Sequence, residues 1–341
     1  MNYLYEYLAF LAKSASLVAV IAIGIVSVLL VLARQKSGKG ALEIEDLSTR
    51  YEELQQQMEH SLLEKSEIKK REKARKAEDK ARRKKESEEC KGRVFVIDFK
   101  GGMEAKEVAS LREEVSSVLA IAKSDDEVVV RLESGGGVVH GYGLCASQLQ
   151  RIRDRGIHLT VAIDKVAASG GYMMACVAQH IIAAPFAIVG SIGVVAQLPN
   201  FNRLLQKHDI DYEQHTAGKY KRTLTLFGKN DDEGRQKFCA ELESIHQQFK
   251  GFIASHRPRI DLDSVATGEH WLASEAKKLH LVDEIRTSDD YLQSLYDKKQ
   301  VVAVRFKQPK GLSERLGKGV STGIEAGLMR LWQQWRIPFG A

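Results

Sequence analysis

The sequence is poor in cysteine and proline, and it has no motif typical of a metal or nucleotide site. Its four cysteines, Cys90, Cys145, Cys176 and Cys239, show no CxxC spacing and no nearby histidine pair, so we expect no metal site. No Gly-x4-Gly-Lys-Ser/Thr run occurs. A dinucleotide fingerprint is excluded as well, because the candidate glycines are contiguous rather than spaced. We therefore expect no cofactor.

One long segment near the start has no charge at all. Residues 15–33 are an uncharged apolar run, and about twenty such residues in a helix cross the hydrocarbon core of a bilayer. A cleaved signal peptide or a buried helix would be the alternative. However, the apolar region of a signal peptide is usually shorter, and no convincing cleavage site follows here. We predict a retained, single-pass membrane anchor within residues 1–40.

Two further segments have the composition of appendages. Residues 41–92 contain no proline and many charged residues, with opposite charges four positions apart, which predicts a charged helical or disordered stalk. A short coiled coil or a contact with anionic lipid is the alternative reading of its apolar stripe. Acidic residues interrupt the basic ones and no aromatic residues interleave with them, so we expect no nucleic-acid partner. Residues 301–341 form a basic amphipathic tail, suited to a membrane surface or to docking on the body.

Between these appendages, residues 93–300 alternate between strand-like and helix-like segments. Apolar runs typical of strands alternate with segments of helical spacing, which predicts an α/β fold with a mostly parallel sheet. The predicted strands are 94–99, 127–132, 158–163 and 181–184, and the predicted helical segments are 105–122, 142–152 and 167–176. Sites in such sheets collect where strands end. Glycine clusters stand at three of these ends, which is the first pointer to function.

Ser169 is the candidate nucleophile. It lies in the run Ala-Ala-Ser-Gly-Gly-Tyr, shortly after a predicted strand. A helix start there would supply free N–H groups, and Gly170 would let the backbone approach a carbonyl closely. Gly136 and Gly137, after the preceding strand, would aim further amides as an oxyanion hole. Taken alone, each segment also fits a capping serine or a flexible loop.

A base for Ser169 is not evident among the histidines, and no Gly-x-Ser-x-Gly elbow occurs. A lysine serves instead where burial favours its free amine. Lys219 and Lys221 follow Gly218. A surface lysine is the ordinary alternative for either one.

The motifs together resemble the signal peptide peptidase A family of serine peptidases, in its short, SohB-type branch. They are Ala-Ala-Ser-Gly-Gly-Tyr, Gly-Ser-Ile-Gly-Val at 190–194, Gly-x-x-Lys at 218–221, and Ala-Thr-Gly-Glu at 266–269 followed by Trp271. The resemblance covers roughly residues 93–292. One departure is Gly135, which stands where the family often has proline, so this loop should be less rigid.

The resemblance implies a ClpP/crotonase-like superhelix of stacked ββα units and serine endopeptidase activity. It implies that Ser169 is the nucleophile, Lys221 the general base and Ser191 the residue that orients the lysine, with Lys219 as the fallback base. Gly137 or Gly136, together with Gly170, would provide the oxyanion amides. It also implies a homo-oligomer in which the lysine of one protomer serves the serine of the next, and a peptide or protein substrate such as a remnant of a membrane segment.

Two other functions remain open from sequence: a crotonase-like acyl-CoA enzyme, and a silent membrane scaffold. The side of the membrane is also open. Three basic residues, Arg34, Lys36 and Lys39, follow the apolar run. By the positive-inside rule, this charge would keep the body in the cytoplasm. The family resemblance instead implies a bacterial inner-membrane protein with a periplasmic body, and we adopt that expectation.

Overall fold

The computed structural model describes residues 10, 13–16, 18–21, 24, 40–64, 66–71, 73–74 and 92–308. The chain divides into two compact units, residues 42–306 and residues 1–41 with 307–341. In the second unit, the described residues up to 24 are helical. Most of the predicted anchor and most of the predicted tail lie outside the described residues. Among those that are described, no helix is long and apolar enough to cross a membrane.

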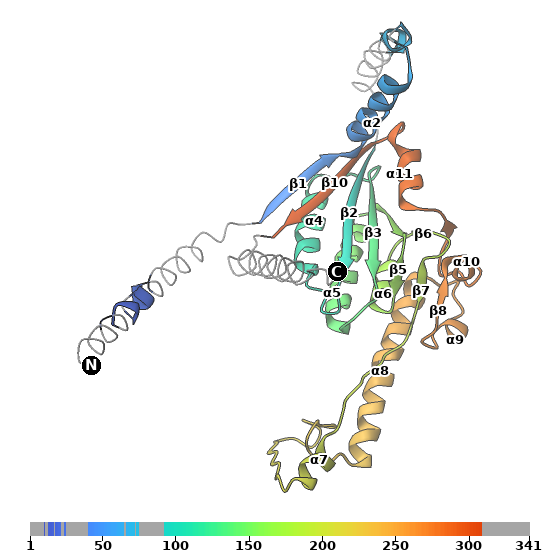
Figure 1. Ribbon diagram of the computed structural model, residues 1–341. Coiled ribbons are helices and arrows are strands. Elements are labelled where there is room, and N and C mark those ends of the chain that lie inside the picture. Colours follow the sequence, from blue (N-terminus) through green and yellow to red (C-terminus); the bar gives the residue numbers. More distant parts are fainter. Residues whose placement is uncertain are drawn as a thin grey trace, which may run out of the picture. The chain divides into compact units, whose positions relative to one another are not determined.

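Over the residues that the structure describes, the larger unit is built on a ten-stranded sheet (Figure 1). Its strands are β1 (Ala41–Asp46), β2 (Arg93–Gly101), β3 (Glu127–Ser134), β4 (His158–Ile163), β5 (Val166–Ala168), β6 (His180–Ala183), β7 (Ile188–Gly190), β8 (His270–Leu272), β9 (Glu284–Ile285) and β10 (Gln300–Lys307). The main path runs β1-β10-β2-β3-β4-β6-β9, and β5 branches from β3 to pair with β7, which pairs with β8. From β10 through β2, β3, β4 and β6 to β9, and from β3 through β5 to β7, neighbouring strands are parallel, whereas β7 and β8 are antiparallel.

Helices connect the strands and cover the sheet. They are α2 (Leu47–Leu62), α4 (Val108–Ile121), α5 (Val139–Asp154), α6 (Gly170–Ala175), α7 (Asn202–Lys207), α8 (Asp232–His256), α9 (Leu262–Val265), α10 (Ala273–Ala276) and α11 (Ser288–Tyr296). The mixed α/β architecture predicted from sequence is confirmed. The segment 167–176 differs from its helical prediction, because its first two residues belong to β5 and the helix α6 begins only after Ser169.

The central strands contain apolar runs such as Val94–Ile97 and Val128–Val130, in which every residue is buried because both faces of the sheet are covered. In β2, Phe95, Ile97 and Phe99 join the larger core cluster, which also contains residues of α4, α5 and α6. The alternate residues Val94 and Val96 join a second cluster on the other face, with residues of α11 and β10. Buried parallel strands of this kind read as continuous apolar runs rather than as alternating ones.

The folded body is larger than the predicted 93–300 segment at both ends. Strand β1 and the start of α2 come from the predicted stalk, and most of β10 comes from the predicted tail. Leu47 is buried in the second core cluster. The N–H of Val301 donates to Ser48 Oγ (3.0 Å), and the rings of Tyr51 and Tyr296 stack with centroids 4.8 Å apart. These segments are rich in charged residues, so their composition does not reveal the few residues that pack against the body.

A buried carboxyl group, Glu114 on α4, fastens the end of β10. Its Oε1 accepts a hydrogen bond from the N–H of Phe306 (2.8 Å), and its side chain lies among buried residues. Burial raises the pKa of Glu114 from 4.5 to about 7, and the nearby charge of Asp98 adds to that effect. Between these two pH values the folded protein holds a proton that the unfolded chain has lost. Stability should therefore fall as pH rises through that window.

The variant Glu114→Gln keeps the acceptor for Phe306 and removes the titration. On going from pH 5 to pH 8, the free energy of unfolding of the variant should rise by about 1–3 kcal/mol relative to that of the parent chain. Urea unfolding at both pH values measures this gain. Glu113→Gln, at an exposed position on the same helix, serves as the control. A Glu114→Gln difference that is the same at both pH values would contradict the assignment.

Candidate active site

Ser169 stands at a sharp turn between β5 and α6. It is the N-cap residue of α6, with φ 52° and ψ −119°, a conformation that costs a non-glycine residue about 1–3 kcal/mol. Its N–H donates to the carbonyl of Gly190 (2.8 Å), and its carbonyl accepts from the N–H of Met173 (3.0 Å). A strained strand-to-helix turn is how nucleophile elbows expose a serine. Ser169 thus has that local geometry without the Gly-x-Ser-x-Gly motif.

The glycine loop after β3 lies directly against Ser169, because β3 pairs with β5. Gly136 has φ +87°, and a Cβ there would lie 2.7 Å from the amide nitrogen of Gly170 and 2.8 Å from Cβ of Ser169. The N–H of Gly136 is already engaged, because it donates to Ser134 Oγ (3.1 Å). Within the described part of the chain, no hydrogen bond engages the N–H of Gly137 or of Gly170. These two amides are the ones free to meet a substrate oxygen.

Tyr142 on α5, which sequence reasoning missed, supports both glycine segments. It is fully buried, and its hydroxyl donates to the carbonyl of Gly102 (2.7 Å) and is hydrogen-bonded to Ser134 Oγ. A Cβ at Gly170 would lie 2.4 Å from the ring of Tyr142, so only glycine fits there. Burial raises the pKa of Tyr142, which keeps its hydroxyl protonated. No sequence signal marks this tyrosine apart from its short distance after the glycines.

Ser191 is brought next to the nucleophile. Strand β7 pairs in parallel with β5, which places Gly190 opposite the residue before Ser169. Ser191 also has φ 52°, and its N–H donates to the carbonyl of Glu269 (2.6 Å). A Cβ at Gly190 would lie 2.7 Å from the ring of Trp271. The motif that ends in Trp271 therefore forms the wall that holds the Ser191 turn in place.

Lys221, in contrast, lies on an arm formed by residues 196–231 (Figure 1). The arm is attached at the start of α8, where Tyr220 donates to Glu233 Oε1 (3.0 Å). The other end of α8 enters the body, with Phe249 in the large core cluster. The helix between Glu233 and Phe249 is about 24 Å long. Lys221 is exposed, and a single chain does not bring it to Ser169.

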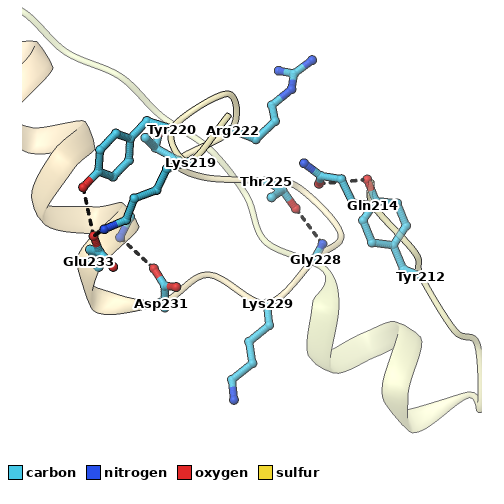
Figure 2. Close-up of a pocket in the computed structure, with 12 residues that line it drawn as sticks. Tyr212, Gln214, Lys219, Tyr220, Arg222, Thr225, Gly228, Lys229, Asp231 and Glu233 are labelled. Atoms are coloured by element: carbon cyan, nitrogen blue, oxygen red, sulfur yellow. Dashed lines mark hydrogen bonds and ion pairs between the residues drawn. The ribbon is translucent and has the colours of Figure 1, made fainter. Parts of the chain in front are cut away.

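Lys219, the fallback base, is engaged on the same arm. It forms an ion pair with Glu233, and the hydrogen bond and charge of that carboxylate raise the pKa of Lys219. An ammonium held in this way loses its proton less readily, so Lys219 is poorly suited to act as the neutral base. Lys219 and Glu233 line an open cavity of about 440 Å³ at the start of α8 (Figure 2).

Other candidate chemistry is not assembled in the described residues. Burial raises the pKa of the Cys145 thiol to about 12 and raises that of Cys176 as well, so neither is poised as a nucleophile. Cys239 is exposed, and Cys90 lies outside the described residues. Within the part of the chain that the structure describes, no group of three or more metal-ligating side chains gathers.

Comparison with known proteins gives consistent matches along the chain. The family model described as peptidase family S49 N-terminal matches residues 2–149, and that of peptidase family S49 matches residues 151–302. The probable protease SohB of Haemophilus influenzae is 50% identical over 293 residues, which are 83% of each chain. The probable protease SohB of Buchnera aphidicola subsp. Schizaphis graminum is 50% identical over 303 residues, which are 88% of each chain.

A solved structure, a mutant of the 1510-N membrane-bound stomatin-specific protease, aligns over 60% of this chain and 84% of its own length. The identity is 15% and the TM-score is 0.34, too low for any argument about the site.

Proposed function

We propose that this chain, which belongs to the SohB-type branch of peptidase family S49, is a serine endopeptidase with Ser169 as nucleophile and Lys221 as general base. The family assignment predicted from the motifs is confirmed by these matches, and with it a peptidase function. The observation that carries the serine mechanism is the strained turn of Ser169, which lies against the Gly136 loop. The crotonase-like and scaffold alternatives have no comparable support.

The proposed reaction begins when the neutral amine of Lys221 removes the proton from Ser169 Oγ. The oxygen attacks the carbonyl carbon of a peptide bond, and the resulting oxyanion accepts hydrogen bonds from the N–H groups of Gly137 and Gly170. One such donor is typically worth a factor of about 10² to 10³ in rate. Ser191 would hold the lysine amine in place. The leaving amine takes up the proton, and water, activated by the same base, then hydrolyses the acyl-enzyme.

The lysine in this proposal comes from an adjacent protomer. The arm carries Lys221 about 24 Å of helix away from the body of its own chain, so a second copy is the natural recipient. The arm also exposes apolar side chains that a neighbouring body would cover, among them Phe201, Ile210, Tyr212 and Phe227. Desolvation in such a contact favours the neutral form of a lysine.

We further propose the finer features that the resemblance implies. The sheet and its helices would form a ClpP/crotonase-like superhelix, and residues 1–40 would anchor the chain in a bacterial inner membrane with the body in the periplasm. Substrates would be extended peptides or proteins, such as remnants of membrane segments or signal-peptide-like polypeptides. The support is the uncharged run at 15–33 and the small residues around Ser169.

Labelling with a fluorescent fluorophosphonate tests the nucleophile. Ser169 Oγ would attack phosphorus, fluoride would leave, and the serine proton would pass to the base. We expect peptide mapping of the labelled full-length chain to locate the probe on Ser169 and on no other serine. A chain that cleaves casein while the probe labels a different residue, or none, would overturn the proposal.

A further inference from the structure

The turn that carries Lys221 contacts the carboxylate of Glu233 on α8 through both of its central residues. We propose that Glu233 is a positioning residue for the catalytic base: it fixes the 218–221 turn so that Lys221 is presented to the serine of the neighbouring protomer. This inference rests on the proposed function, because it takes Lys221 to be the base.

The first observation is the geometry of the turn itself. The N–H of Lys221 donates to the carbonyl of Gly218 (3.1 Å), which closes a four-residue turn. Gly218 has φ +95°, a conformation in which glycine carries little strain. Lys219 and Tyr220 are therefore the two central residues, and Lys221 is the residue at which the chain leaves the turn.

The second observation is that both central residues bind the same oxygen atom. Tyr220 donates its hydroxyl hydrogen to Glu233 Oε1 (3.0 Å), and the Nζ of Lys219 forms an ion pair with that oxygen (Figure 2). The Nζ of Lys219 also lies 5.1 Å from the centre of the Tyr220 ring. The amine of Lys237, one helical turn after Glu233, lies 5.4 Å from that centre. Two ammonium groups, one from the turn and one from α8, thus lie close to the Tyr220 ring.

The third observation places a second anchor just after Lys221. A Cβ at Gly234 would lie 2.3 Å from the carbonyl oxygen of Thr223, so the chain leaving the turn packs directly on the first turn of α8. The N–H of Gly234 is capped by Asp231 (2.7 Å). Lys221 therefore lies between two attachment points. No ion pair or side-chain hydrogen bond of its own holds Lys221 within the described structure.

This arrangement separates the roles of the two neighbouring lysines. The amine of Lys219 is paired with Glu233 and helps to fix the turn. The backbone N–H of Lys221 is hydrogen-bonded within the turn, and its amine has no ion-pair partner in the described structure. The carboxylate acts at the end of a 25-residue helix whose other end is packed in the core. A shift at this end would therefore change where the arm presents its lysine. Misplacement of a catalytic group by about 1 Å can cost a factor of 10² in rate.

Mixed oligomers of full-length chains test the inference. Co-expression of a Ser169→Ala chain with a Lys221→Ala chain, followed by purification on two different tags, gives assemblies in which one chain provides the lysine and the other the serine. The probe is the fluorescent fluorophosphonate, and the rate at which it labels the serine-providing chain is the readout. Glu233→Gln is then added to one chain at a time. Asp232→Asn is the matched control, since it also removes one charge from the first turn of α8, but the carboxylate of Asp232 pairs with Arg235 on the same helix.

On the lysine-providing chain, Glu233→Gln should slow labelling about tenfold. On the serine-providing chain it should leave labelling unchanged, as Asp232→Asn should on either chain. An equal loss on both chains would mean a general structural role and overturn the inference, as would no loss on either. If the starting pair is not labelled at all, the shared dyad itself fails, and the inference falls with it. If Asp232→Asn matches Glu233→Gln, the effect is one of helix charge and the inference is wrong.

Discussion

Replacing Lys221 with alanine is expected to lower the rate of casein cleavage by at least about a thousandfold, whereas Lys219→Ala should lower it by about tenfold or less. The two lysines are two positions apart on one exposed turn, so a general effect of lost positive charge would be the same for both. The expected difference arises from what each amine does. Lys219 is paired with Glu233, and Lys221 is the amine left to remove a proton.

The expected size of the Lys221→Ala effect follows from the proposed mechanism. Without a base, Ser169 would have to lose its proton to water, while the amides of Gly137 and Gly170 would still stabilise the oxyanion. Catalytic serines that lose their base keep a residual activity of this kind. Lys219→Ala instead removes one of two bonds that hold the turn, and Tyr220 retains the other.

The measurement is the initial rate of cleavage of fluorescein-labelled casein by purified full-length chains. Size-exclusion chromatography of each variant shows whether assembly is preserved. Equal losses for both variants would contradict the assignment of Lys221. A larger loss for Lys219→Ala would exchange the two roles and make Lys219 the base.

The central fold and the meeting of the two glycine segments could be predicted from the sequence. Apolar runs such as Val94–Ile97 mark strands buried on both faces, and in a parallel sheet the ends of adjoining strands lie at the same edge. That rule places the Gly136 loop near the end of the next strand, and the pairing of β5 with β3, which the sequence did not predict, brings Gly136 against Ser169. The strained conformation of Ser169 could not be predicted, because it depends on the Gly190 carbonyl supplied by β7.

Where the sequence was less informative, long-range packing decides the structure. Strand β10 is a short apolar run within a basic region, and its pairing with β1 and β2 makes it part of the body. Tyr142 likewise depends on long-range packing, because its role comes from contacts with Gly102 and Gly170, which are far away in the sequence. The position of Lys221 depends on the direction in which α8 leaves the core, which local spacing does not encode.

Gly170→Ala should both destabilise the protein by about 1–3 kcal/mol and lower activity by about a hundredfold. A Cβ at this position would lie 2.4 Å from Cγ and 2.7 Å from Cδ2 of Tyr142. The ring cannot move aside easily, because it is fully buried and its hydroxyl is hydrogen-bonded to Ser134 and to the Gly102 carbonyl. The start of α6 must therefore shift, and it carries both Ser169 and the Gly170 amide.

Gly143→Ala is the matched control for this change. Gly143 lies within α5, the same helix as Tyr142, and a Cβ there would meet no atom within 4 Å. Alanine in a helix interior is favoured over glycine by about 0.5–1 kcal/mol, so this variant should be slightly more stable and equally active. Thermal unfolding and fluorophosphonate labelling of folded protein measure the two effects separately. Full labelling of a stable Gly170→Ala chain would contradict both the close contact of Gly170 with Tyr142 and the role of the Gly170 amide.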